Sequence, residues 1–305
     1  MVAAEFGHYL DEFRWSDSEW ESLLLSIRAK RCTPFVGAGA CAGLLPTATD
    51  LVDEWVKSDG YPFTSGRSLD RVAQYVATVR DVQVPKLRIV EKFRSLRITR
   101  PFDPSDEAHT LNRLAKLRQP IYLTTNYDDY LVAALTNEFN AGPEVACCDW
   151  YLPRDKRRRF KGLAPTADKP LVYHLHGRYQ DPPSMVLTED DYLDFLTQVI
   201  DDKRLLPPAV DGAFGNSMFL FIGYGLTDLN FRVLFKKLAM YRAANAYTHV
   251  AVQLEPGDTQ ATNEMKLRQA VYLSKLYKDF LKVKLFWATA AEFMRELTDR
   301  LGAHP

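Results

Sequence analysis

Apolar residues recur along the chain with two different spacings, which predict helices and short strands in turn. At the N-terminus, Ser16 is followed three residues later by Glu19, and apolar residues then fall on one helical face up to residue 30. This capping-box pattern predicts an amphipathic helix over residues 16–30. A five-residue apolar run follows at residues 32–36 and predicts the first strand.

After this first predicted strand, the spacing of apolar residues is helical for a long stretch. The pattern begins near Leu51, and it continues over residues 69–79 and 86–96. These helices interrupt the first crossover from strand to strand. We therefore expect a single domain over residues 1–305, with a small helical insertion at about 60–108 and a helical extension at 1–30.

From residue 109 onward, helices and strands alternate regularly. Runs of four to six residues rich in β-branched and aromatic residues predict strands at 121–124, 145–148, 171–175, 218–222, 249–254 and 283–287. Helical spacing between them predicts helices at 109–117, 128–139, 189–205, 229–243, 261–280 and 290–301. Buried strands separated by helices are typical of an α/β fold. We predict a Rossmann-like, mainly parallel sheet with helices on both faces and a small helical subdomain inserted after the first strand.

The charge balance and the cysteines narrow the range of partners. Lysine plus arginine and aspartate plus glutamate each total 39, so no global basic field attracts nucleic acid. The basic run at 154–161 is typical of a solvated loop, and direct nucleic-acid binding is not favoured. The four cysteines include no CxxC pair, so no zinc or other metal site is expected.

Hydropathy gives no sign of a membrane or export segment. No apolar run approaches the roughly 18 to 20 residues that a membrane-spanning helix needs. The first eleven residues carry acids and lack the basic-then-apolar pattern of a secretion signal. We therefore expect a cytoplasmic protein that does not associate with membranes.

In an open parallel sheet, ligands bind beyond the carboxyl ends of the strands, and glycine-rich loops follow two of the predicted strands. The first loop, Gly37-Ala38-Gly39-Ala40, matches with Ala42 the G-x-G-x-x-G/A dinucleotide fingerprint. Its glycines would let backbone N–H groups approach a pyrophosphate, although the same residues are common in plain turns. The second, Gly223-Tyr224-Gly225, precedes Asp228, which could cap the next helix or contact a ribose.

Polar side chains follow two other predicted strands. The run Thr124-Thr125-Asn126-Tyr127-Asp128 comes directly after one of them. Thr125 or Asp128 could cap the following helix, but capping does not explain the Asn126 amide, which can hold a water or a ribose hydroxyl. The other strand ends in His174-Leu175-His176-Gly177. The two histidines alone make a poor metal site, whereas a neutral His176 imidazole at a strand end suits a general base.

In their order and spacing, these loops resemble the sirtuin superfamily over about residues 32–290. Gly37-Ala38-Gly39 is similar to the family's GAG loop, residues 124–128 to its T-x-N-x-D motif, and His176-Gly177 to its HG motif. The resemblance implies NAD as substrate, with Asn126 and His176 as the catalytic residues. It also implies contacts to the dinucleotide from the remaining loop residues: Gly37, Ala38, Gly39, Ala40, Thr124, Asp128, Gly223, Tyr224, Gly225 and Asp228.

The departures from deacylase sirtuins point to one branch of that superfamily. Ala40-Cys41 replaces the usual Ile-Ser pair, and no cysteine follows Cys148, so the zinc ribbon is missing. The chain thus resembles the sirtuin-like branch of bacterial anti-phage defence proteins. The resemblance implies hydrolysis of NAD+ to ADP-ribose and nicotinamide by a regulated effector. It also implies a homo-oligomer or a separate partner, such as a HerA-type ATPase or an Argonaute-like protein.

Three other functions are compatible with parts of this pattern. An NAD-dependent protein deacylase would need an acyl-lysine groove, half of which has no obvious source without the ribbon. A sensor module would bind NAD or ADP-ribose without turnover. A dehydrogenase shares the glycine loop, but Gly43, Pro46 and Thr47 delay the helix that should follow it.

Overall fold

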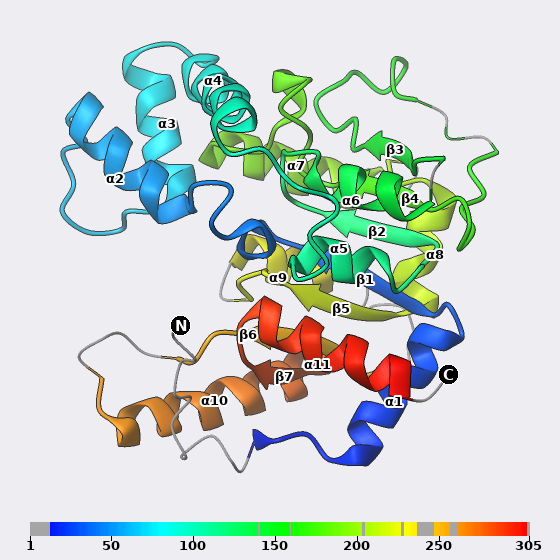
Figure 1. Cartoon of the computed structure of the whole chain (residues 1–305). Coiled ribbons are helices and arrows are strands. Elements are labelled where there is room, and N and C mark those ends of the chain that lie inside the picture. Colours follow the sequence, from blue (N-terminus) through cyan, green and yellow to red (C-terminus); the bar gives the residue numbers. More distant parts are fainter. Residues whose placement is uncertain are drawn as a thin grey trace.

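In a computed structural model, the described part of the chain forms a seven-stranded parallel sheet with helices on both faces (Figure 1). Strand order across the sheet is β3-β4-β2-β1-β5-β6-β7, so β1 lies in the middle. Every neighbouring pair is parallel, which confirms the predicted Rossmann-like α/β fold. The structure describes residues 13–139, 141–158, 160, 162–202, 205–226, 229–236, 247–256 and 261–303.

The strands are short and lie close to their predicted positions. Their bounds are β1 Cys32–Val36, β2 Ile121–Thr124, β3 Glu144–Cys147, β4 Leu171–His174, β5 Met218–Ile222, β6 His249–Gln253 and β7 Val283–Trp287. Four have the predicted bounds, and the ends of β3, β4 and β6 differ by one residue from prediction. Successive side chains point to opposite faces of the sheet, and both faces are buried. In β5, for example, Phe219 and Phe221 belong to one core, and Leu220 and Ile222 to the other.

Four helices cover each face of the sheet and close one core on each side. One core is completed by α1 Asp17–Arg28, α5 Thr110–Ala115, α6 Tyr130–Phe139 and α11 Ala290–Ala303. The other is completed by α7 Glu189–Asp201, α8 Pro208–Asn216, α9 Leu229–Phe235 and α10 Asn263–Leu281. Buried aliphatic and aromatic residues fill both cores, so the sheet is a rigid base for the loops at its edge.

Two helices on the second face differ from the prediction. The helix expected over 189–205 ends at Asp201, and a separate helix, α8, begins at Pro208. Proline has no backbone N–H to donate and its φ suits a first helical turn, so Pro208 starts a new helix. Gly212 and Gly215 lie inside α8 and obscured its pattern. Part of the helix predicted over 229–243 lies outside the described residues, which stop at 236 in this stretch.

Three helices between β1 and β2 form a cluster of their own beside the sheet (Figure 1). They are α2 Ala48–Asp59, α3 Leu69–Val79 and α4 Val84–Thr99, and their buried residues form a third core. Polar contacts tie this cluster to the start of α7: Lys86 pairs with Asp191 at 2.8 Å, and Gln74 with Asp190 at 2.8 Å. The Lys86 ammonium and Asp191 carboxylate are both largely buried, so this contact fixes α4 against α7.

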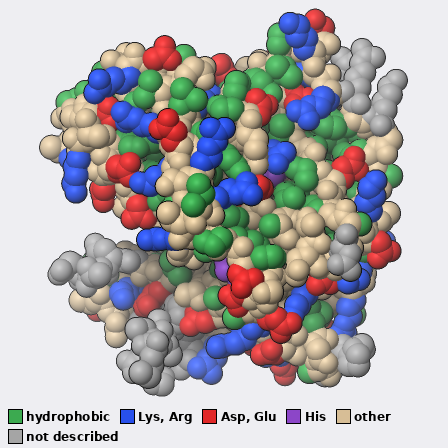
Figure 2. Space-filling model, turned by 45° about the horizontal axis from the view of Figure 1, so that its top comes forward, with side chains coloured by type: hydrophobic (Ala, Val, Ile, Leu, Met, Phe, Trp, Pro, Cys, Tyr) green, Lys and Arg blue, Asp and Glu red, His purple; other side chains and the backbone are tan. Residues whose placement is uncertain are grey.

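The surface carries charges of both signs. Figure 2 shows lysine and arginine side chains interspersed with aspartate and glutamate over the face it presents. In the basic run, Arg157 pairs with Asp202 at 2.7 Å and Arg158 with Asp149 at 3.3 Å. These two arginines therefore attach the basic run to the rest of the domain. None of the helices described is both long and apolar enough to cross a membrane.

Candidate active site

A cavity of about 300 Å³ lies where the loops after β1, β2, β4 and β5 meet, at the carboxyl edge of the sheet. The loops contribute Ala38, Thr125, Asn126, Tyr127, Asp128, His176, Gly223, Tyr224 and Gly225 to its wall. Parallel strands bring their carboxyl ends to one edge, so residues far apart in sequence meet there. The structure thus brings together one or more residues from each of the four loops singled out in the sequence.

The opposite wall of this cavity is apolar and comes from the helical cluster. Ala48 and Leu51 of α2, Leu69 of α3, and Ile89 and Phe93 of α4 line it, with Leu45 and Pro46 just before α2. Tyr192, in the first turn of α7, closes one side. Helical spacing in the sequence predicts the helices that carry Leu51, Leu69, Ile89, Phe93 and Tyr192, but it assigns none of these residues to a site. Helical periodicity shows which residues are buried without showing what they cover.

Asn126 follows β2 with its side chain held in one orientation. Its Nδ2 donates to the Gly37 carbonyl at 3.2 Å and lies 3.5 Å from the Cys41 sulfur. A carbonyl can only accept a hydrogen bond, so the atom facing Gly37 must be the nitrogen. The other amide atom, Oδ1, has no hydrogen bond to any described residue. Asn126 therefore offers this oxygen to the cavity as an acceptor.

Thr124 and His174 support Asn126 from behind, and neither lines the cavity. The buried Thr124 hydroxyl donates to the Val36 carbonyl at 3.1 Å and accepts from the Asn126 N–H at 3.0 Å. It shapes the loop through these two hydrogen bonds, and a direct contact of Thr124 with the dinucleotide stays a prediction. His174 Nδ1 lies 3.0 Å from the Asn126 carbonyl oxygen, and burial lowers its pKa to about 3. A neutral ring donating from Nδ1 fits this contact.

His176 follows β4 and lines the cavity, with only 5% of its surface exposed. Its ring packs edge-to-face against Tyr192 and Phe195, with centroids 5.4 and 5.1 Å away. Desolvation in this aromatic setting lowers the pKa of His176 to about 3. The imidazole is therefore neutral at physiological pH, with a lone pair available to accept a proton.

The glycine after His176 is required by the turn. Gly177 has φ +79°, which L side chains rarely adopt, and an added Cβ would lie 2.1 Å from the Ser184 carbonyl oxygen. The same Ser184 oxygen accepts a hydrogen bond from the Trp150 indole at 2.8 Å. Gly177 thus lets the chain turn sharply after β4 and leaves His176 at the cavity wall.

Asp128 lines the cavity and lies two residues before α6. Its carboxylate accepts from the N–H of Tyr130, the first residue of that helix, at 3.0 Å. Desolvation by burial is the main influence on Asp128 and raises its pKa to about 6. The Cys41 sulfur lies 3.9 and 3.8 Å from the two carboxylate oxygens. A carboxyl group that titrates near neutral pH is thus placed next to Asn126.

The glycine loop after β1 packs closely against the loop after β5, and contact of Gly37 and Gly39 with a dinucleotide stays a prediction. Their N–H groups donate to the Ile222 and Gly223 carbonyls at 2.9 and 2.8 Å. The Ala40 N–H donates to the Gly37 carbonyl at 3.0 Å. These three amides are thus engaged within the protein, and Ala38 is the member of the four-residue loop that lines the cavity. A helix does not follow directly: a 3-10 turn spans Ala38–Cys41, and α2 starts at Ala48.

The loop after β5 packs tightly against the glycine loop. Gly223 has φ +66°, and a Cβ there would lie 2.1 Å from the Ala40 nitrogen. The Tyr224 ring packs edge-to-face on Phe35 with centroids 5.2 Å apart, and its carbonyl accepts from Gln253 at 2.7 Å. Gly223, Tyr224 and Gly225 therefore form a fixed rim of the cavity. Asp228, predicted to cap a helix or contact a ribose, lies outside the described residues.

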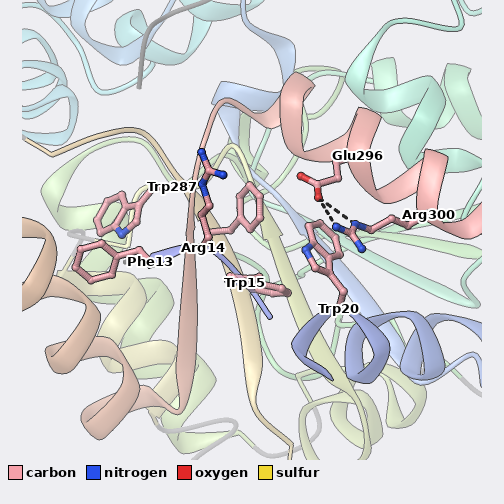
Figure 3. Close-up of a pocket in the computed structure, with 8 residues that line it drawn as sticks. Phe13, Arg14, Trp15, Trp20, Trp287, Glu296 and Arg300 are labelled. Carbon is pink, nitrogen blue, oxygen red and sulfur yellow. Dashed lines mark hydrogen bonds and ion pairs between the residues drawn. The ribbon is translucent and has the colours of Figure 1, made fainter. Parts of the chain in front are cut away.

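A second pocket, of about 380 Å³, lies beside β7 and is shown in Figure 3. It is lined by Phe13, Arg14, Trp15, Trp20, Phe286, Trp287, Glu296 and Arg300. Its groups already contact one another: Arg300 lies over Trp20 at 4.7 Å and pairs with Glu296 at 2.9 Å. It is built from the N-terminal segment, α1, β7 and α11, and includes none of the four strand-end loops. The cavity containing Asn126 and His176 is therefore the candidate active site.

No group of three or more potential metal ligands was found among the residues that the structure describes. Cys147 and Cys148 are buried, as is Cys41, and burial raises the pKa of each thiol. A protonated thiol is a poor metal ligand. The side chains that line the cavity include an amide, an imidazole, a carboxyl group, the hydroxyls of a threonine and three tyrosines, and apolar surface.

Known proteins are similar to this chain over part of its length. Three curated relatives are NAD(+) hydrolases named ThsA. That of Acinetobacter baumannii (strain 532279) is 24% identical over 194 residues, covering 61% of this chain and 37% of that protein. That of Bacillus cereus (strain MSX-D12) is 27% identical over 176 residues, covering 55% and 34%. That of Enterococcus faecium is 28% identical over 142 residues, covering 46% and 26%. The chain thus spans about a third of the length of these relatives, or less.

The family comparison covers more than half of the chain. Residues 120–275 match the family described as the SIR2-like domain. The matched stretch includes three of the four loops around the cavity, those carrying Asn126, His176 and Gly223. The glycine loop lies before it, but its backbone is hydrogen-bonded to the matched part through Ile222 and Gly223. The chain belongs to the SIR2-like domain family.

Proposed function

We propose that this chain is an NAD+ glycohydrolase. Water would attack the anomeric carbon of the nicotinamide ribose while the bond to nicotinamide breaks, giving ADP-ribose, nicotinamide and a proton. The observation that carries this proposal is the pairing of Asn126 and His176 in one cavity at the carboxyl edge of the sheet. The relatives named as NAD(+) hydrolases support the same reaction.

Asn126 and His176 would have different roles at the reacting carbon. The free Oδ1 of Asn126 would accept a hydrogen bond from the attacking water or from a ribose hydroxyl, and so orient it. His176 would take up the proton as the water attacks, directly or through that hydroxyl. Burial holds the free His176 ring neutral, so its lone pair can accept a hydrogen bond from that water or hydroxyl at physiological pH.

The rest of the cavity would hold the substrate. Leu69, Ile89 and Phe93 offer an apolar wall that suits the flat nicotinamide ring and excludes bulk water from the reaction. Ala38 and the rim residues Gly223 and Tyr224 would contact the diphosphate and ribose through backbone groups. Asp228 is proposed to contact the adenosine half. Neither zinc nor another cofactor takes part in this scheme.

We further propose that the activity is a regulated effector function in cytoplasmic anti-phage defence. Uncontrolled loss of NAD+ would poison the host cell, so the hydrolase needs a restraint. A homo-oligomer, or a separate partner such as a HerA-type ATPase or an Argonaute-like protein, would supply it. The resemblance to the sirtuin-like branch of defence proteins supports this part of the proposal.

The test is to incubate the purified protein with NAD+ and to quantify products by liquid chromatography, with and without an acetyl-lysine peptide. We expect equimolar nicotinamide and ADP-ribose without the peptide. Nicotinamide release that depends on the peptide would instead identify a protein deacylase. Saturable NAD+ binding, measured by calorimetry, without any release even when the proposed partner and trigger are present would identify a sensor module.

A further inference from the structure

Cys41 lies directly behind the proposed catalytic amide without lining the cavity. It ends the 3-10 turn after β1 and is 1% exposed. Its sulfur contacts two side chains from the loop after β2: the Asn126 Nδ2 at 3.5 Å, and the Asp128 carboxylate oxygens at 3.9 and 3.8 Å. A thiol has one proton to donate and a sulfur that accepts weakly, so it can bridge these two groups.

The direction of each hydrogen bond follows from the groups involved. Burial and the nearby Asp128 carboxylate raise the pKa of Cys41 well above its usual value, so the sulfur keeps its proton. The Asn126 Nδ2 carries only donors, so the sulfur accepts from it. The S–H is then left to donate to Asp128. The thiol thus links Asn126 to Asp128 in a fixed direction.

This link decides where the other amide atom of Asn126 lies. One Nδ2 proton is used by the Gly37 carbonyl and the second by the Cys41 sulfur. With both protons bound behind the loop, Oδ1 is turned toward the cavity. An amide held at one point alone turns easily, because the terminal torsion of asparagine is broad.

We propose that Cys41 is a positioning residue for NAD+ hydrolysis, which holds the Asn126 amide in its reactive orientation through the Asp128–Cys41–Asn126 contacts. The proposal rests on the proposed function of the same cavity. It differs from a simple packing role, because a buried cysteine that only fills space could be replaced by any residue of similar size. A hydroxyl should replace the thiol in part, since it also donates and accepts.

The kinetic test compares Cys41→Ala, Cys41→Ser and Cys32→Ala. Cys32 is a matched control, because it is also 1% exposed and its thiol makes no hydrogen bond to any described residue. We expect Cys41→Ala to lower kcat by about 10-fold with KM within about twofold, since misplacing a reactive group costs rate more than binding. Cys41→Ser should recover most of the loss. Cys32→Ala should keep the wild-type kcat even if it lowers Tm.

Wild-type kcat in Cys41→Ala would overturn the proposal, and so would equal losses in the serine and alanine variants. A second readout does not depend on catalysis. Raman difference spectra, wild type minus Cys41→Ala and wild type minus Cys32→Ala, assign one S–H stretching band to each cysteine. The Cys41 band should lie at lower wavenumber than the Cys32 band. Equal wavenumbers would show that Cys41 donates no hydrogen bond. A wild type without nicotinamide release would contradict the proposed function, whereas this band would still decide the Cys41 contact.

Discussion

The two walls of the cavity are built in opposite ways. On the sheet side, loops after β1, β2, β4 and β5 present polar atoms whose orientations are fixed by backbone hydrogen bonds, such as Gly39 to Gly223 at 2.8 Å. On the other side, α2, α3 and α4 present apolar side chains, and they share a core with Tyr179, Met185 and Leu187 from the segment between β4 and α7. The helical cluster reaches the sheet domain partly through side-chain contacts, including Lys86 with Asp191.

The two walls therefore have different tasks: the sheet side positions reacting groups, and the helical side binds the shape of the substrate. A wall of hydrogen-bonded loops can hold a reacting group to within a few tenths of an ångström, which catalysis requires. An apolar wall excludes water and selects shape, and it tolerates small displacements. Changes on the sheet side should therefore lower kcat, while changes on the helical side should mainly raise KM.

The largest expected effect comes from Asn126→Asp. The substitution keeps the shape of the side chain but puts a carboxylate oxygen against the Gly37 carbonyl, where Nδ2 now donates at 3.2 Å. The new side chain should turn away, and we expect kcat to fall at least about 100-fold, a loss typical of removing a group that orients the nucleophile. Nicotinamide release at saturating NAD+ measures this. Activity within twofold of wild type would remove Asn126 from the chemistry.

Gly223→Ala should disrupt the sheet side as a whole. Its Cβ would lie 2.1 Å from the Ala40 nitrogen at a φ of +66°, so the two packed loops must separate. We expect a loss of about 2 kcal/mol or more in unfolding free energy, combining backbone strain with the clash. Gly212→Ala is the matched control, because Gly212 lies inside α8 with open space at its Cβ position, and it should gain about 0.5–1 kcal/mol. Denaturant unfolding of both variants checks the contrast, and equal stabilities would refute it.

Acid should destabilise the protein through histidines on or next to its strands. Burial lowers the pKa values of His174, His176 and His249 to about 3, whereas an unfolded histidine titrates near 6.5. Below pH 6.5 the unfolded chain binds more protons than the folded protein. As the pH is lowered, the free energy of unfolding therefore decreases by up to about 1.4 kcal/mol per pH unit for each histidine. Asp128, with its pKa raised to about 6, opposes this between about pH 6 and 4, because there the folded state binds the extra proton.

His249→Asn isolates one of these contributions. His249 starts β6, and its Nδ1 accepts from the Phe219 N–H at 3.1 Å, which an asparagine amide oxygen can partly replace. On unfolding between pH 6.5 and 5, the variant should take up about one proton fewer than wild type, so its unfolding free energy should depend less steeply on pH. It should keep the wild-type kcat. Denaturant unfolding at several pH values gives the slope. An unchanged slope would mean that His249 is not held neutral in the folded state.

The smallest effect is expected on the helical wall. Leu69→Ala removes apolar surface from the cavity wall, and we expect KM for NAD+ to rise several-fold with kcat within twofold, as about 1–2 kcal/mol of binding is lost. Leu87→Ala is the control, since Leu87 lies on α4, is 48% exposed and does not line the cavity. A fall in kcat for Leu69→Ala, or the same KM for NAD+ in both variants, would contradict the proposed difference between the two walls.

Sequence patterns captured the sheet side of the molecule well. Strand bounds followed from short apolar runs, and the rule that ligands bind at strand ends led to Asn126 and His176. Both lie at the cavity, together with Asp128 and the Gly223 loop. These features are local: a strand end and the residues after it are contiguous in sequence, and the parallel sheet brings the ends together.

Contacts between distant segments could not be predicted in the same way. The glycine fingerprint suggested phosphate binding, but the N–H groups of Gly37 and Gly39 are bound by residues 222 and 223. Thr124 matches the motif and yet points into the structure. The apolar wall and Tyr192 depend on how α2–α4 pack against α7, and periodicity carries no information on that packing.

The most direct measurement of the central claim follows nicotinamide release from NAD+ by wild type, His176→Ala and His249→Asn under the same conditions. All three proteins should bind NAD+ and unfold cooperatively. The account predicts release by wild type and His249→Asn, and a loss of at least about 100-fold in kcat for His176→Ala. Equal release by wild type and His176→Ala, or NAD+ binding by wild type without any release, would contradict it.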